Sequence, residues 1–170
     1  LACFVHWKDA AWTRLEGMYA VAVWDRQTRT LTLARDPLGI KPLYFTCQNG
    51  GLAFASELRA LRVLPDHSFS IDGRAVDDVF SFGHVEKRRS ILREVRSLEP
   101  GNVLHLGAGG EPVISRFWQP RFQIREDLSE ADWIEETRER VAETVRAHML
   151  SDVPVGAFLS GGIDSGIITA

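Results

Sequence analysis

The residues best suited to chemistry form one short run, Ser160-Gly161-Gly162-Ile163-Asp164-Ser165. An uninterrupted apolar segment, residues 155–159, precedes the run and predicts a buried strand, while Asp164 and Ser165 are residue types that favour the start of a helix. The two glycines can adopt positive φ, so the backbone of the turn can approach a ligand closely. Free N–H groups at such a turn, together with the dipole of the following helix, favour the binding of an anion.

The run is not a Walker P-loop, because no lysine follows Gly162. It resembles instead the SGGxDS pyrophosphate loop (PP-loop) of the ATP pyrophosphatases. An ordinary glycine turn before a capped helix is the alternative, but five specified residues in a strand–turn–helix context favour the PP-loop. Asp164 has the oxygen ligands that Mg²⁺ prefers, so it is the candidate magnesium ligand. The resemblance implies that ATP and pyrophosphate are bound by Leu159, Ser160, Gly161, Gly162, Ile163, Asp164 and Ser165.

Composition excludes several other classes of function. The chain has 170 residues, is 45% hydrophobic and carries a formal net charge of −3, which gives no general attraction to nucleic acid or to anionic membranes. No apolar run approaches the ~18 residues of a membrane span. Cys3 and Cys47 have neither CxxC spacing nor a nearby histidine cluster, so a zinc site and a disulfide framework are not indicated. We expect a cytoplasmic protein without nucleic-acid or membrane partners.

The first part of the chain is rich in predicted strands. Strands are expected over residues 18–24, 31–35, 43–46 and 52–55, and the turn Asn49-Gly50-Gly51 joins the last two as a hairpin. Because tight turns join these strands, we predict one antiparallel sheet. Helices over 57–64 and 74–82 follow, and then two further strands over 102–106 and 112–118.

The last part of the chain predicts a different architecture. A helix is expected over residues 131–150, with Ser129 as its N-cap and apolar residues along one stripe. This helix, the strand over 155–159 and the glycine turn would form the first unit of a doubly wound α/β sheet. Such sheets bind nucleotides at the carboxyl ends of their strands. One strand is not a complete parallel sheet, so the unit is expected to be partial.

Several motifs, taken in order, resemble the glutamine-dependent asparagine synthetases. They lie at residues 15–20, 34–44, 55–61, 98–101 (an L-x-P-G turn) and 151–165. The resemblance covers essentially the whole chain. It implies part of an α+β, antiparallel-sheet glutaminase domain of the N-terminal-nucleophile type over 1–122, a linker over 123–128, and the start of an α/β PP-loop ATP-pyrophosphatase domain over 129–170.

The resemblance also implies a reaction, the ATP-dependent synthesis of an amide. A carboxylate, aspartate in the best-known members, attacks the α-phosphorus of ATP; pyrophosphate leaves, and ammonia from glutamine displaces AMP from the acyl-adenylate. Fixed N–H donors at Gly161, Gly162 and the helix start would stabilise the leaving pyrophosphate. ATP and Mg²⁺ are the implied cofactors, and a homodimer is left open. One departure is Gly166, where family members usually carry a second serine.

The family's glutamine-attacking cysteine does not stand in this sequence. Cys3 is followed by Phe4-Val5-His6 rather than by small residues, so we reject it as the nucleophile, and we expect Cys47 to be inert. The nucleophile is expected upstream, and this segment alone is expected to be inactive. Arg35 and Asp36 are interpreted as a structural ion pair at a turn.

Three alternatives remain open. The acid need not be aspartate, since β-lactam synthetases, lasso-peptide cyclases and amidotransferases of polysaccharide clusters share the chemistry. A degenerate, non-catalytic binding module is a second class; Gly166 favours it, and the intact run from Ser160 to Ser165 argues against it. A stand-alone N-terminal hydrolase would need the missing cysteine and would not need the PP-loop.

Overall fold

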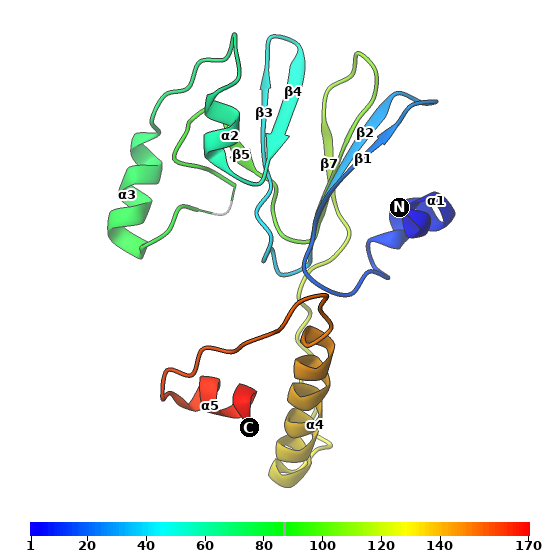
Figure 1. The fold of residues 1–170 in the computed structure, drawn as a ribbon, viewed down its shortest axis with the longest axis vertical. Helices are drawn as coiled ribbons and strands as arrows, with labels where there is room; N and C mark the ends of the chain where they lie inside the picture. Colours follow the sequence, from blue (N-terminus) through cyan, green and yellow to red (C-terminus); the bar gives the residue numbers. More distant parts are fainter. Residues whose placement is uncertain (87) are drawn as a thin grey trace. The chain divides into compact units, whose positions relative to one another are not determined.

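The computed structural model describes residues 1–86 and 88–170, and it divides into two compact units, Leu1–Pro120 and Arg121–Ala170 (Figure 1). One member of the charged run at 86–89, Lys87, lies outside the described residues. Over the described part of the chain, no helix has both the length and the apolar character needed to cross a membrane.

The first unit contains two antiparallel sheets, not the single sheet predicted from the sequence. In one sheet the order is β1-β2-β6-β7, and in the other it is β4-β3-β5. The single-sheet prediction was wrong because β2 pairs with β1 along one edge and with β6 along the other, where Ala34 lies opposite Val103. Neither edge of β2 is therefore free to pair with β3. The strands are β1 (Ala20–Asp25), β2 (Thr30–Arg35), β3 (Tyr44–Gln48), β4 (Gly51–Ala55), β5 (Arg96–Ser97), β6 (Asn102–Leu106) and β7 (Val113–Arg116).

The hairpin between β3 and β4 follows the sequence prediction. Asn49 and Gly50 both have positive φ, 54° and 72°, and Gln48 lies opposite Gly51. Two consecutive positive φ values define the type I′ turn, whose twist matches that of antiparallel strands. The Asn-Gly pair therefore sets the register of this hairpin.

The two sheets pack face to face, and helical segments cover their outer faces. The short helices α1 (Ala2–Trp7) and η1 (Lys8–Ala11) lead to Trp12, which packs with Ala34 and Val103 on the outer face of the first sheet. Leu61 of α2 (Leu58–Arg62) packs with Leu92 and Val95 in a buried cluster on the outer face of the second sheet. A further helix, α3 (Gly73–Phe82), begins at the cap residue Asp72. The core between the sheets consists of Leu33, Leu43, Phe45, Leu98 and Leu104.

The second unit contains two helices, α4 (Glu130–His148) and α5 (Ile163–Thr169). The predicted N-cap of α4 is confirmed: Ser129 and Asp132 form a capping box, in which each side chain accepts a backbone N–H of the other residue.

The strand predicted over residues 155–159 is not formed. Phe158 is fully exposed, and Leu159 is 66% exposed. A strand needs a neighbour to accept its N–H groups and donate to its carbonyls, and within its described residues the second unit has no other strand. The first α/β unit predicted from the sequence therefore lacks its strand here.

Candidate functional site: the glycine turn before α5

The predicted PP-loop is a turn that is closed by two serine side chains. The backbone N–H of Ser160 donates to Oγ of Ser165 at 3.3 Å, and the two hydroxyl oxygens lie 3.0 Å apart. The Ser165 hydroxyl donates to the carbonyl of Gly162 at 3.1 Å. Since a serine has one O–H donor, Ser160 is the donor in the hydroxyl pair. The structure thus brings together Ser160, Gly162 and Ser165 at the start of α5.

Backbone geometry explains the two glycines. Gly161 has a φ of 81°, a left-handed conformation that costs other residues about 1 kcal/mol or more. Gly162 is the N-cap residue of α5, with no side chain to occupy the space in front of the helix. Among the described residues, the backbone N–H groups of Gly161, Gly162, Ile163 and Asp164 donate no hydrogen bond within the chain. Within the described residues the N–H of Ser165 is likewise without an acceptor, so the turn presents five free donors.

The side chains of the other predicted site residues, Leu159, Ile163 and Asp164, are exposed and form no hydrogen bond with the turn. Leu159 is 66% and Ile163 80% exposed, and the carboxylate of Asp164 also lies at the surface. No group of three or more His, Cys, Asp or Glu residues in the described part of the chain is arranged to hold a metal ion. Mg²⁺ at phosphate sites commonly uses one or two protein carboxylates and takes its other ligands from phosphate oxygens and water. Asp164, one exposed carboxylate beside free N–H donors, fits that pattern.

The setting of Cys47 does not activate its thiol. Cys47 lies within β3, and partial burial of its thiol raises the pKa of that thiol. Cys3 lies in α1 and is half-buried. A nucleophilic cysteine needs a lowered pKa, so Cys47 is an unsuitable nucleophile.

Arg35 and Asp36 organise a turn, but they do so through the backbone. Among the described residues these two side chains form no ion pair with each other, so that prediction was wrong. The carboxylate of Asp36, which is 1% exposed, accepts the N–H groups of Ile40 and Lys41 at 3.0 Å each. The guanidinium of Arg35 donates to the carbonyls of Gly39, Lys41 and Leu98 at 2.7–2.8 Å and to the Ser97 hydroxyl at 3.0 Å.

Known families match both units of the chain. The family model of the glutamine amidotransferase domain matches residues 1–118, and the model of asparagine synthase matches residues 136–170. The α+β architecture with antiparallel sheets that was predicted for the first part is what the structure has.

Curated relatives give the same result. The chain is 36% identical over its whole length to asparagine synthetase [glutamine-hydrolyzing] 1 of Bacillus subtilis. It is 42% identical, again over its whole length, to a putative asparagine synthetase [glutamine-hydrolyzing] of Mycobacterium tuberculosis. In both comparisons the chain spans 27% of the relative's length.

A more distant likeness links the chain to a solved glutamine phosphoribosylpyrophosphate amidotransferase of B. subtilis, at 19% identity and a TM-score of 0.43, covering 94% of this chain and 31% of that one. The family matches are far more specific. The chain belongs to the glutamine amidotransferase domain family, with a segment of the asparagine synthase family following in the same chain.

Proposed function

We propose that the chain is a segment of an ATP-dependent ligase that transfers the amide nitrogen of glutamine to an acid, with aspartate as the first candidate acid. The observation that carries the proposal is the turn at 160–165, where five backbone N–H groups are free and two serine side chains hold the loop closed. The matches to asparagine synthase over 136–170 and to the glutamine-hydrolyzing relatives support it.

The residues of the turn have different roles in the proposed release of pyrophosphate. As the bond between the α- and β-phosphates breaks, negative charge gathers on the leaving pyrophosphate, and preorganised N–H donors stabilise it without any reorganisation. Gly161 and Gly162 provide two of these donors, and residues 163–165 provide the other three. Mg²⁺ held by Asp164 would neutralise phosphate charge, and Leu159 would contact the nucleotide through its backbone. The doubly wound α/β sheet around this turn belongs to the same proposal.

The proposed sequence of bonds is simple. A carboxylate oxygen of the acid attacks the α-phosphorus of ATP, pyrophosphate leaves, and an acyl-adenylate remains. Ammonia derived from glutamine then attacks the acyl carbon, and AMP leaves. The glutamine-hydrolysing step requires a nucleophile that the present residues do not provide, so it is assigned to the intact protein, as is any homodimer.

A degenerate binding module is the second candidate, and Gly166 favours it because a hydroxyl expected from the family is missing. The two are separated by incubating the intact protein with ATP, aspartate and glutamine labelled with ¹⁵N in its amide group. The ligase proposal expects ¹⁵N in a new amide of the acid and one AMP for each amide formed. If folded protein formed neither a labelled amide nor AMP with aspartate or with any of a panel of other acids, only the binding module would remain.

A further inference from the structure

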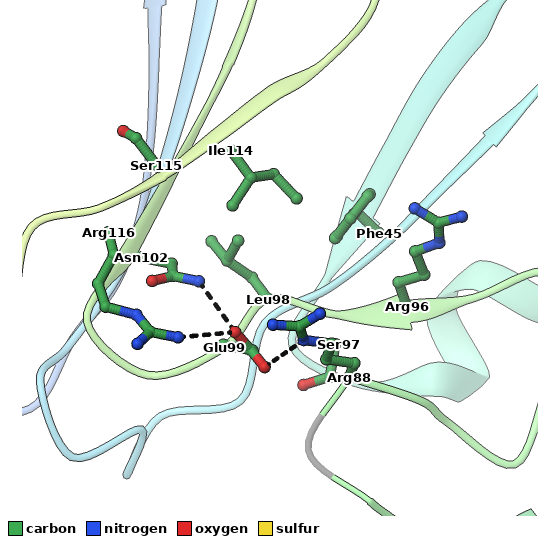
Figure 2. A pocket seen from close by; sticks show the side chains of 10 residues that line it. All are labelled: Phe45, Arg88, Arg96, Ser97, Leu98, Glu99, Asn102, Ile114, Ser115 and Arg116. Carbon is green, nitrogen blue, oxygen red and sulfur yellow. Dashed lines mark hydrogen bonds and ion pairs between the residues drawn. The ribbon is translucent and has the colours of Figure 1, made fainter. Parts of the chain in front are cut away.

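The first unit contains a second polar site, which lies apart from the glycine turn in the sequence and in its chemistry. It is a cavity of about 500 Å³ between the edge strands β5 and β7, within the first unit (Figure 2). Its apolar lining consists of Phe45, Leu98 and Ile114. Its polar lining consists of Arg88, Arg96, Arg116, Glu99, Asn102, Ser97 and Ser115.

The charges of this cavity do not balance. Three arginines and one glutamate line the cavity, so its side chains carry a formal charge of +2. Glu99 accepts from Arg88 Nε at 2.6 Å and lies 3.5 Å from Arg116 Nη2. Figure 2 shows Glu99 between these two guanidinium groups. Among the described residues Arg96 has no ion-pair partner, so its charge is not compensated within the chain.

The arginines keep most of their hydrogen-bonding capacity for a ligand. A guanidinium has five N–H donors in a planar fork that fits carboxylate and phosphate groups in bidentate fashion. Arg88 uses one donor on Glu99, and Arg116 uses one on Glu99 and one on Gln119. The side chains of Arg88 and Arg116 are 71% and 49% exposed, so a dissolved anion can reach them. Phe45 and Leu98, which also line the cavity, are buried, and a poorly solvated wall strengthens charge interactions.

Glu99 serves as the internal anion of the cavity. The hydrogen bond from Arg88, followed by the charges of Arg88 and Arg116, holds the pKa of Glu99 below its ordinary value, so the carboxylate is ionised at neutral pH. It also accepts from the amide of Asn102 at 3.3 Å. Glu99 thus binds Arg88 and Arg116 but not Arg96. The positive charge that Glu99 leaves uncompensated would have to be neutralised by a ligand.

We infer that this cavity binds a small oxyanion with two negative charges, of the phosphate or dicarboxylate type, through Arg88, Arg96 and Arg116. Two charges on the ligand neutralise the excess of +2, and the volume accommodates a small ligand and not a nucleic acid. Every residue of the site lies in the first unit, so the inference does not rest on the glycine turn at 160–165.

The test is calorimetric titration of the intact protein, without ATP, with inorganic phosphate and with succinate at constant ionic strength. Arg96→Gln and Arg116→Gln are each expected to weaken binding by about fivefold to tenfold, the loss of a charge-assisted contact at a solvent-accessible site. Glu99→Gln is expected to tighten binding by about fivefold, because it removes a negative charge near the ligand. Arg93→Gln is the matched control, an exposed arginine outside the cavity, and should bind as the parent protein does.

The two probes separate the ligand classes. Preference for phosphate assigns a phosphoryl ligand, and preference for succinate assigns a dicarboxylate. Phosphate can also bind at the glycine turn, but that binding would respond to Asp164→Asn and not to Arg96→Gln. The inference is overturned if neither probe binds, or if Arg93→Gln weakens binding as much as Arg96→Gln does. It is also overturned if Glu99→Gln leaves the affinity unchanged.

Discussion

The hydroxyl oxygens of Ser160 and Ser165 lie 3.0 Å apart, on either side of the glycine turn that precedes α5. This contact joins the residue before the two glycines to the first turn of the helix. The backbone between them is therefore held in one conformation, with its N–H groups free for a ligand.

Gly161→Ala is expected to weaken ATP binding by about fivefold to tenfold. No atom lies within 4 Å of the added methyl group, so the cost comes from the φ of 81° alone, about 1–2 kcal/mol for an L residue. Gly156→Ala is the matched control, because it also has open space around it and has no positive φ. Both variants are titrated with ATP. Equal affinities for Gly161→Ala and Gly156→Ala would contradict a role of the Gly161 conformation in ATP binding.

Gly166→Ser tests the departure from the family pattern. Gly166 lies within α5 and has no neighbour within 4 Å of an added Cβ, so a serine fits without displacing other atoms. Serine also has a higher helix propensity than glycine, by about 0.5 kcal/mol. If a hydroxyl here donates to phosphate, the affinity for pyrophosphate should rise by about fivefold, the value of one added charge-assisted hydrogen bond at an exposed site. Gly166→Ala adds helix propensity without a hydroxyl, and an equal gain for both variants would refute the role of the hydroxyl.

Gly101→Ala should destabilise the first unit by about 3 kcal/mol or more. Its φ is 65°, and an added Cβ would overlap the backbone carbonyl of Trp118, which the chain cannot easily move. The carbonyl of Gly101 also accepts the N–H groups of Phe117 and Trp118. Gly73→Ala is the control, since it lies at the start of α3 with open space, and it should be neutral or slightly stabilising. Denaturant unfolding of both variants measures the difference, and similar losses would contradict the argument.

Asp36→Asn should lower the free energy of unfolding by about 1–3 kcal/mol at neutral pH, because an amide can accept at only one of the two positions that the carboxylate serves. Burial alone would raise the pKa of Asp36, but the N–H groups of Lys41 and Ile40 outweigh it and lower the pKa.

A folded-state pKa below the unfolded value gives stability that is present above the unfolded pKa of about 3.9 and is lost as the pH falls through the folded pKa. The parent protein should therefore lose stability on acidification below about pH 4, and Asp36→Asn should lose less. Thermal unfolding over this pH range tests the sign, and identical pH profiles would count against the role of Asp36.

Local patterns were predicted well from the sequence, and long-range partners were not. Asn49 and Gly50 determine their turn by themselves, and Ser129 with Asp132 caps α4 without help from distant residues. The division into two sheets depends on the pairing of β2 with β6, about 70 residues later in the chain, and no local pattern predicts that pairing.

The candidate sites divide in the same way. The run at 160–165 is contiguous and could be found by its spacing alone. Arg88, Arg96 and Arg116 are separated in sequence and line one cavity only after β5 and β7 are in place, with Arg88 and Arg116 bonded to Glu99. The strand expected over 155–159 was wrong because an apolar run predicts burial but does not supply the neighbouring strand that must pair with it.

ATP–pyrophosphate exchange in the intact protein tests the central claim most directly, with aspartate compared against a panel of other acids. The account predicts exchange that depends on the acid and falls by about 10²-fold in Asp164→Asn, with Glu143→Gln on the exposed face of α4 as the unaffected control. Exchange that requires an acid other than aspartate would support the adenylation mechanism and identify that acid as the substrate in place of aspartate. Folded protein without exchange for any acid would contradict the assignment of residues 160–165 to pyrophosphate.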